Sequence, residues 1–450
     1  MFASVLLDAS LAAPRNLAAV FSFDKRARVC ACAFTSLFTK HTMMRTALRR
    51  VARQRCTRHA SAASQQGGSG PLKVAAAGAA GAVIYFNNQT IRGSALYWSL
   101  ADAGANMLRE GISDAEDAHA YALQLLNLGL GPVAPKADAA LETTVFGLTF
   151  AAPVGVAAGF DKRGLAHAPL GAMGFGFVEV GGVTPAPQPG NERPRVFRLK
   201  EDRAVVNFVG LPSEGAEVVA ARLKAAEKTC VVGANVTKNA ISKDAVADHA
   251  RVVKALDGAV DFVVVNASCP NVKGGVVDVK AMAALVEVAR QNCSVPVLLK
   301  VSPDLDERQR RTVANTALRL KLDGLVVANT TSRRPHRDSS PPLFKTPLLS
   351  PDVPDRGGLS GPPLVENTRA IVHDFYRKTK GRVPIVGVGG VSSADDAYAL
   401  IRAGASLVQL YTALVYHGPG LGCEIRDGLV ERARRDGFER VRDAVGADHR

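Results

Sequence analysis

From about residue 145 onward, apolar runs of five to seven residues alternate with longer stretches whose apolar positions recur every three or four residues. The short runs are rich in Val, Ile and Leu, which is typical of strands buried on both faces of a parallel sheet. They span 153–157, 176–180, 230–236, 261–265, 295–301, 323–328, 383–388 and 406–410. The longer stretches predict helices, among them 214–228, 243–256, 278–291, 305–320, 365–380 and 393–403. Eight strands in strict alternation with helices predict an α/β fold of the (β/α)8 type, a TIM barrel.

A doubly wound sheet is the alternative arrangement for strands that alternate with helices. The count of eight favours the barrel, and so does the absence of a GxGxxG sequence after the first strand. We therefore expect the barrel to occupy residues 136–450.

The segment before the barrel has a different pattern. Residues 72–86 are apolar except for Lys73, but this run is shorter than the roughly 20 residues that span a bilayer. Residues 71–92 are thus a possible membrane anchor, and a buried helix is the alternative. Residues 96–130, within a predicted helical domain at 93–135, predict one or two amphipathic helices, with Ser113 and Glu116 at capping-box spacing. These helices form either a membrane-surface platform or a layer packed on the barrel.

Charge separates a leader from the rest of the chain. Residues 1–70 hold eleven Lys and Arg against Asp8 and Asp24, which accounts for +9 of the net charge of +15. An Arg-, Ser- and Ala-rich segment with few acids is typical of a mitochondrial transit peptide. A chloroplast leader and an RNA-binding arm are the alternatives. The remaining +6 is spread over 380 residues, too diffuse to indicate a nucleic-acid partner.

The seven cysteines show no paired spacing, so the sequence predicts neither a disulfide framework nor a zinc site. No acidic cluster indicates another metal site. This cysteine usage suits a reducing compartment.

Polar residues and glycines follow nearly every predicted strand. If the barrel is correct, these positions share one mouth, because the carboxyl ends of the strands meet there. They are Ala158, Gly159, Lys162, Gly181, Gly182, Thr184, Asn235, Asn266 to Asn271, Lys300, Asn329, Thr330, Gly389, Gly390, Tyr411 and Thr412. Glycines after the seventh strand and a Thr after the eighth suit a phosphate site built from backbone N–H groups. Gly358 to Gly361 strengthens that prediction.

A phosphate site with many amides indicates a phosphorylated planar cofactor. Lys300 ends a buried strand, where an ammonium is costly without a partner. A flavin would provide that partner, because negative charge develops on its ring when it is reduced. A lysine at the barrel rim is the alternative reading. Lys162 would suit a substrate carboxylate, although a surface lysine is the commoner outcome.

The segment from Asn266 to Asn271 places two amides, a hydroxyl and a thiol directly after a buried strand. Pro270 restricts Cys269 to extended conformations, so the thiol is held in place. The amides suit flat, amide-like ligands. An inert buried cysteine is the alternative, and the surrounding polar residues favour a functional one.

Together these motifs resemble dihydroorotate dehydrogenase from about Leu72 to Arg450, specifically the class 2, quinone-reducing enzymes of mitochondria. The motifs are Ala157-Ala-Gly-Phe-Asp-Lys162, Met173-Gly-Phe-Gly-Phe-Val-Glu-Val180, Arg193-Pro-Arg-Val-Phe-Arg198, Asn266-x-x-Cys-Pro-Asn271, Gly357-Gly-Leu-Ser-Gly361, Val383-Pro-Ile-Val-Gly-Val-Gly-Gly390, Arg402-Ala-Gly-Ala-Ser-Leu-Val-Gln-Leu-Tyr-Thr412 and Gly446-Ala-Asp-His449.

The resemblance implies FMN-dependent oxidation of dihydroorotate to orotate in pyrimidine biosynthesis, with a ubiquinone-type quinone as acceptor at the inner mitochondrial membrane. By motif, FMN contacts would come from Ala157, Ala158, Gly159, Asn235, Asn266, Lys300, Gly361, Gly390, Tyr411 and Thr412. Substrate contacts would come from Lys162, Asn207, Asn266, Asn271, Asn329 and Thr330, and Cys269 would be the catalytic base. His119 and Arg198 fall where the family lines its quinone tunnel, within the helical segment 93–135 and the barrel.

The chain departs from the class 2 pattern at several positions. Cys269 replaces the usual Ser and matches the soluble class 1 enzymes. The run from Asn207 to Ser213 differs from the usual Asn-Arg-x-Gly-Phe-Asn, so Leu211 and Pro212 replace polar or aromatic contacts. Gly182 and Ala328 replace hydroxyl residues, the loop after Asn271 lacks Leu-Arg, and the segment from Arg333 to Arg356 is long. A related FMN barrel that uses fumarate, NAD or another dihydropyrimidine is therefore the alternative.

Overall fold

The computed structural model describes residues 89–267, 279–334 and 348–450. All of them lie in the unit that begins at Gly81. The predicted leader 1–70, the apolar run 72–86, Cys269 and Asn271 fall outside the described residues. None of the described helices is both long and apolar enough to cross a bilayer.

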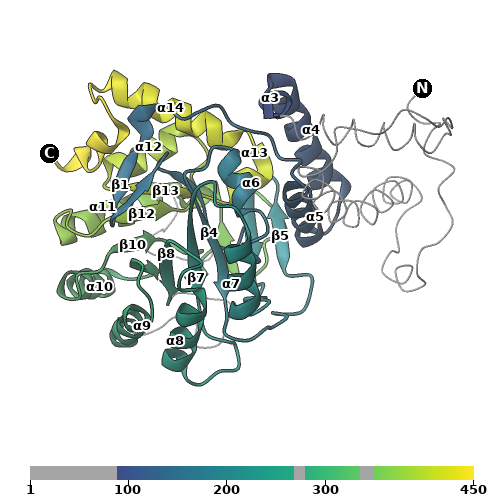
Figure 1. Ribbon diagram of the computed structural model, residues 1–450. Coiled ribbons are helices and arrows are strands. Elements are labelled where there is room, and N and C mark those ends of the chain that lie inside the picture. The colour runs from purple at the N-terminus through teal and green to yellow at the C-terminus, as the bar shows by residue number, and fades with distance from the viewer. Residues whose placement is uncertain (1–88, 268–278, 335–347) are drawn as a thin grey trace, which may run out of the picture. The chain divides into compact units, whose positions relative to one another are not determined.

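Eight parallel strands close into a barrel with helices around it (Figure 1). In chain order they are β3 (Val154–Val156), β4 (Phe177–Val183), β7 (Val231–Val236), β8 (Phe262–Asn266), β9 (Val297–Val301), β10 (Gly324–Val327), β12 (Ile385–Val388) and β13 (Leu407–Leu410). Each predicted strand overlaps one of them, so the barrel prediction is confirmed. Strand β13 pairs with β3 and closes the ring.

The main surrounding helices are α6 (His167–Ala172), α7 (Ala216–Ala225), α8 (Ala245–Leu256), α9 (Val279–Gln291), α10 (Glu307–Arg319), α11 (Val365–Thr379), α12 (Ala394–Arg402) and α14 (Leu421–Arg435). Their apolar stripes pack on the outer faces of the strands in one large core. The strands are buried on both faces, which explains why their sequences are apolar runs without alternation.

A second core cluster fills the barrel interior. Phe177 and Phe262 are the first residues of β4 and β8 and are fully buried in this cluster. The hairpin of β1 (Thr143–Val145) and β2 (Leu148–Phe150) packs against them: the Phe150 ring lies 5.4 Å from that of Phe177, and the Phe146 ring 5.9 Å from that of Phe262. The amino-terminal end of the barrel is therefore packed with aromatic side chains.

A separate antiparallel sheet lies beside the barrel mouth. It consists of β5 (Val196–Leu199), β6 (Ala204–Asn207) and β11 (Gly358–Ser360), in the order β11-β6-β5. Asn207 is opposite Gly358, so two distant segments of the chain are brought together there.

The amino-terminal helices are α3 (Gln89–Arg92), α4 (Ala95–Gly111) and α5 (Ala115–Asn127). Helix α4 contacts α13 (Thr412–His417) and α5 contacts β5, so this segment packs on the barrel domain (Figure 1). The cap of α5 is Asp114 and not Ser113, because the Asp114 carboxylate accepts from the backbone N–H groups of Glu116 and Asp117. The capping-box prediction was wrong by one residue.

Candidate active site

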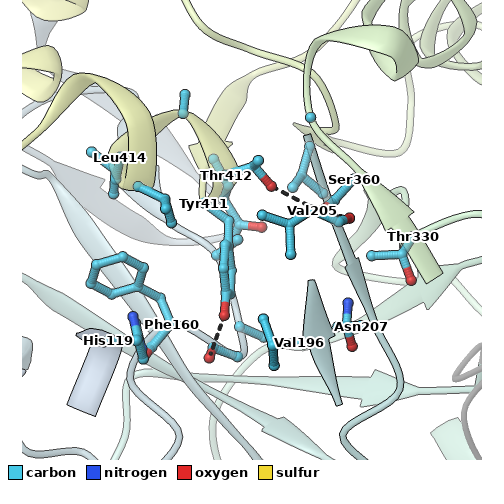
Figure 2. A pocket seen from close by; sticks show the side chains of 18 of the residues that line it. His119, Phe160, Val196, Val205, Asn207, Thr330, Ser360, Tyr411, Thr412 and Leu414 are labelled. Atoms are coloured by element: carbon cyan, nitrogen blue, oxygen red, sulfur yellow. Dashed lines mark hydrogen bonds between the residues drawn. The ribbon is translucent and has the colours of Figure 1, made fainter. Parts of the chain in front are cut away.

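One cavity of about 260 Å³ opens at the carboxyl ends of the barrel strands and continues to the inner faces of α4 and α5 (Figure 2). Of the strand-end residues expected at the mouth, Gly181 and Thr184 do not line it, and the buried Thr184 hydroxyl donates to the Ala186 carbonyl instead. Every residue that the motif resemblance assigns to the site, within the described part of the chain, does line it. These are His119, Ala157, Ala158, Gly159, Lys162, Arg198, Asn207, Asn235, Asn266, Lys300, Asn329, Thr330, Gly361, Gly390, Tyr411 and Thr412. The structure thus brings these residues together, whereas Cys269 and Asn271 lie outside the described residues.

Glycines with left-handed backbone angles form one corner of the cavity. Gly390 has φ +82°, and a Cβ there would lie 2.4 Å from the Val365 nitrogen. Gly361 has φ +115°, and a Cβ there would lie 2.8 Å from the Ala204 Cα. Only glycine fits at these two positions, and both line the cavity, so a ligand can approach the backbone closely there. The Thr412 hydroxyl lies in the same corner and donates to the Ser360 hydroxyl at 2.8 Å (Figure 2).

Amide side chains line the base of the cavity. The Asn266 amide nitrogen donates to the Asn235 amide oxygen at 2.9 Å. The Asn235 amide nitrogen donates to the Glu179 carboxylate at 2.7 Å, and the Gln409 amide nitrogen donates to it at 2.6 Å. Our sequence analysis missed Glu179 and Gln409 as site residues. The available signal was an acid and an amide inside two runs that are otherwise apolar.

Two lysines add positive charge. Lys300 is 5% exposed and sits on β9 beside Asn266 of β8, and its ammonium makes no ion pair or hydrogen bond among the described residues. Lys162 donates to the Gly159 carbonyl at 2.7 Å. A buried ammonium beside amides at a cavity wall suits an electron-rich ligand edge.

The wall near Asn207 is more apolar than the motif resemblance implies. Leu211 and Pro212 line the cavity here, where the class 2 pattern has an aromatic residue and an amide. Gly182 also lines it, and a Cβ at that position would lie 3.3 Å from a Leu211 methyl. The two departures are therefore adjacent in space.

The side of the cavity formed by α5 carries His119. Its Nε2 lies 2.6 Å from the Phe160 carbonyl oxygen, and its ring lies 4.8 Å from the Phe160 ring and 6.3 Å from the Tyr411 ring. Burial, aided by the nearby Lys162 charge, lowers the pKa of His119 to about 4. His119 is consequently neutral at physiological pH, with Nε2–H donating to the Phe160 carbonyl and Nδ1 left as a hydrogen-bond acceptor.

Two arginines attach the helices to the barrel domain. Arg198 donates to the carbonyls of Arg109, Ile112 and Ser113 at 2.6, 2.8 and 3.0 Å, at the carboxyl end of α4. Arg195 forms a bidentate ion pair with Glu116 of α5, in which Nε and Nη2 donate to the two carboxylate oxygens at 2.8 and 2.7 Å. The guanidinium of Arg198 is thus largely occupied by backbone carbonyls.

Comparisons with known proteins identify the family. The family model described as dihydroorotate dehydrogenase matches residues 140–432. The dihydroorotate dehydrogenase (quinone) of Parvibaculum lavamentivorans is 46% identical over 344 residues, which are 75% of this chain and 96% of the relative. The chain belongs to the dihydroorotate dehydrogenase family. A mitochondrial relative, the quinone enzyme of Arabidopsis thaliana, is 41% identical over 374 residues, 75% of this chain and 79% of the relative.

Solved dihydroorotate dehydrogenase structures agree with the fold. The Eimeria tenella enzyme in complex with ferulenol is 36% identical and superposes with a TM-score of 0.71, covering 75% of this chain and 97% of that one. Its ligand-free form gives a TM-score of 0.70 at 36% identity, covering 75% of this chain and 100% of that one. Dihydroorotate dehydrogenases of this family are FMN-dependent, and the site described above fits that cofactor. The glycine corner suits its phosphate, while the amides and the Lys300 ammonium suit its polar ring.

Proposed function

We propose that this chain oxidises (S)-dihydroorotate to orotate with FMN as its cofactor and a quinone as the electron acceptor. The observation that carries the proposal is the continuous cavity, which joins the amide-lined barrel mouth to the inner faces of α4 and α5. One ligand can therefore occupy the mouth while a second approaches along the helices. The quinone-reducing relatives at 41–46% identity support the same reaction.

FMN, when bound, supplies the group that accepts a hydride from the substrate and later passes two electrons on. We assign its phosphate to the corner formed by Gly361, Gly390 and Thr412. Its ring would contact the amides of the cavity base and Lys300. The remaining cofactor contacts proposed here are Ala157, Ala158, Gly159, Asn235, Asn266 and Tyr411.

The substrate is a six-membered ring with amide groups and one carboxylate. We assign the carboxylate to Lys162, whose ammonium lies at the cavity wall beside Gly159. The carboxamides and hydroxyl of Asn207, Asn266, Asn271, Asn329 and Thr330 would pair with the ring, because amides match its alternating donors and acceptors.

The proton at C5 of the substrate must pass to a base on the protein. We assign this role to Cys269, which lies outside the described residues. A thiol has an ordinary pKa of about 8.5, far below that of a serine hydroxyl, so it accepts a proton more readily near neutral pH.

The acceptor would approach past α4 and α5, where His119 and Arg198 line the cavity. Three apolar side chains on α4 support a membrane-facing role for this segment: Leu96, Leu100 and Met107 are 70%, 61% and 72% exposed. We propose that residues 93–135 form a quinone-site domain at the inner mitochondrial membrane, after a leader at 1–70 and a possible anchor at 71–92. The Arg-rich composition of residues 1–70 supports the mitochondrial location.

Stopped-flow mixing of the purified flavoprotein with dihydroorotate tests the proposal. We expect the flavin absorbance to bleach, and to return when a soluble ubiquinone analogue is added. Fumarate and NAD serve as control acceptors, and neither should restore the absorbance at a comparable rate. A yellow protein that dihydroorotate does not bleach at any pH from 6 to 10 would overturn the substrate assignment.

A further inference from the structure

A carboxylate lies directly behind the amides of the cavity base. Glu179 is on β4, is completely buried, and does not itself line the cavity. Its two oxygens accept from the amide nitrogens of Asn235 on β7 and Gln409 on β13. Among the described residues no lysine or arginine pairs with it. Such a group is costly to bury, and the two amide donors supply its stabilisation.

Both oxygens of Glu179 accept hydrogen bonds from amide nitrogens, so the carboxylate sets which way each neighbouring amide points. The Asn235 nitrogen must face Glu179, and its oxygen then faces the Asn266 nitrogen at 2.9 Å. Gln409 is oriented in the same way: its amide nitrogen donates to Glu179, and its amide oxygen is buried without a partner among the described residues.

We propose that Glu179 is a positioning residue of the cofactor site, acting through Asn235 and Asn266. The proposal rests on the proposed function, because it takes FMN to be the ligand of this cavity. Asn235, Asn266 and Gln409 line the cavity and Glu179 does not, so its effect reaches the ligand through the orientation of these amides. Glu179 thereby fixes the pattern of donors and acceptors that the base of the cavity presents to the flavin ring.

Two substitutions separate orientation from charge. Glu179→Met keeps the length of the side chain but removes both acceptors, so Asn235 loses its fixed direction. Glu179→Gln keeps one acceptor for the Asn235 nitrogen. Its own nitrogen can donate to the Gln409 oxygen once that amide turns round, which is possible because the oxygen has no other partner among the described residues. Glu179→Gln therefore removes the charge and retains the orientation.

The experiment measures FMN binding to the deflavinated full-length protein by quenching of flavin fluorescence. We expect Glu179→Met to weaken binding by about 10- to 100-fold, the range for losing a hydrogen bond to a charged group. The absorption bands of the bound flavin should shift as well. Glu179→Gln should bind FMN within about threefold of the wild-type affinity. Equal losses in both variants would show that charge matters and orientation does not, which would overturn the proposal.

A double-mutant cycle tests whether the effect passes through Asn235. In an Asn235→Ala background, Glu179→Met should have a smaller effect on FMN affinity than in the wild type, because one of the amides it positions is already gone. Full additivity would overturn the proposal. Asp248→Asn is the control, since Asp248 is a buried carboxylate on α8 outside the cavity. Thermal unfolding of each apoprotein identifies a variant that fails to fold, in which case the cycle is run with Glu179→Leu.

The wild-type protein in the same titration tests the underlying function separately. If it does not bind FMN, the proposed function fails. If it binds FMN while the two Glu179 variants match it, the positioning role alone fails.

Discussion

Arg198 gives the sharpest test of how the helices are held over the cavity. Its guanidinium donates to three carbonyls at the carboxyl end of α4, where a cation also favours the helix dipole. In Arg198→Lys the charge stays, but an ammonium cannot reach all three carbonyls at once. For a half-buried group each lost hydrogen bond costs about 1 kcal/mol. With two bonds lost, the free energy of opening α4 should fall by about 2 kcal/mol.

That change corresponds to roughly 30-fold faster amide exchange in Ala95–Gly111, measured by native-state hydrogen exchange. The two half-reactions should separate: dihydroorotate reduces the flavin at the wild-type rate, while quinone re-oxidises it more slowly. Lys200→Met is the matched control, because Lys200 lies two residues away and pairs with Glu110 on the exposed surface. It should change neither measurement. Slower re-oxidation without faster exchange would refute the reasoning and place Arg198 in contact with the acceptor.

Three further predictions concern single positions. Gly390→Ala should yield protein with little bound flavin, because the added Cβ would collide with Val365. Bound flavin is measured as the ratio of absorbance at about 450 and 280 nm. The control is Gly437→Ala, which has a similar φ of +83° but open space around it and should retain flavin. The pKa of His119 is lowered to about 4 in the folded protein, so on acidification the unfolded chain takes up this proton at a higher pH than the folded one. The free energy of unfolding should therefore fall between pH 6.5 and 4. In His119→Gln, urea unfolding at several pH values should lack this part of the pH dependence. Cys269→Ser should remain active but slower, with a pH–rate profile that levels off at higher pH than the wild-type profile. Cys269→Ala should lose dihydroorotate oxidation. Full activity in both variants would remove Cys269 from the mechanism.

The barrel could be predicted from sequence because each strand carries its own signal. The run Phe262–Asn266, for example, is apolar until its last residue, and the polar residue marks where the strand reaches the mouth. Lys300 could be found for the same reason, since it interrupts an apolar strand near its carboxyl end. Barrel topology then brings such strand ends together without any further information.

Glu179 and Gln409 were not predicted, because a polar residue inside an apolar strand does not reveal which neighbour it meets. Their pairing depends on barrel closure, which places β13 and β4 on either side of β3. The sheet of β5, β6 and β11 depends on a pairing between Val205 and Ser360, too distant in the chain for local patterns. The cap at Asp114 shows the remaining limit, since adjacent Ser and Asp residues compete and geometry decides between them.

The aromatic packing at the amino-terminal end of the barrel affects where ligands can enter and leave. Added side chains would find no room there: a Cβ at Gly155 would lie 2.4 Å from the Phe177 ring, and one at Gly233 would lie 2.1 Å from the Phe262 ring. Within the described residues the barrel is thus closed at its amino-terminal end, and its cavity lies at the opposite end. Because α4 and α5 form one wall of that cavity, the way these two helices are held should affect how fast ligands exchange on that side.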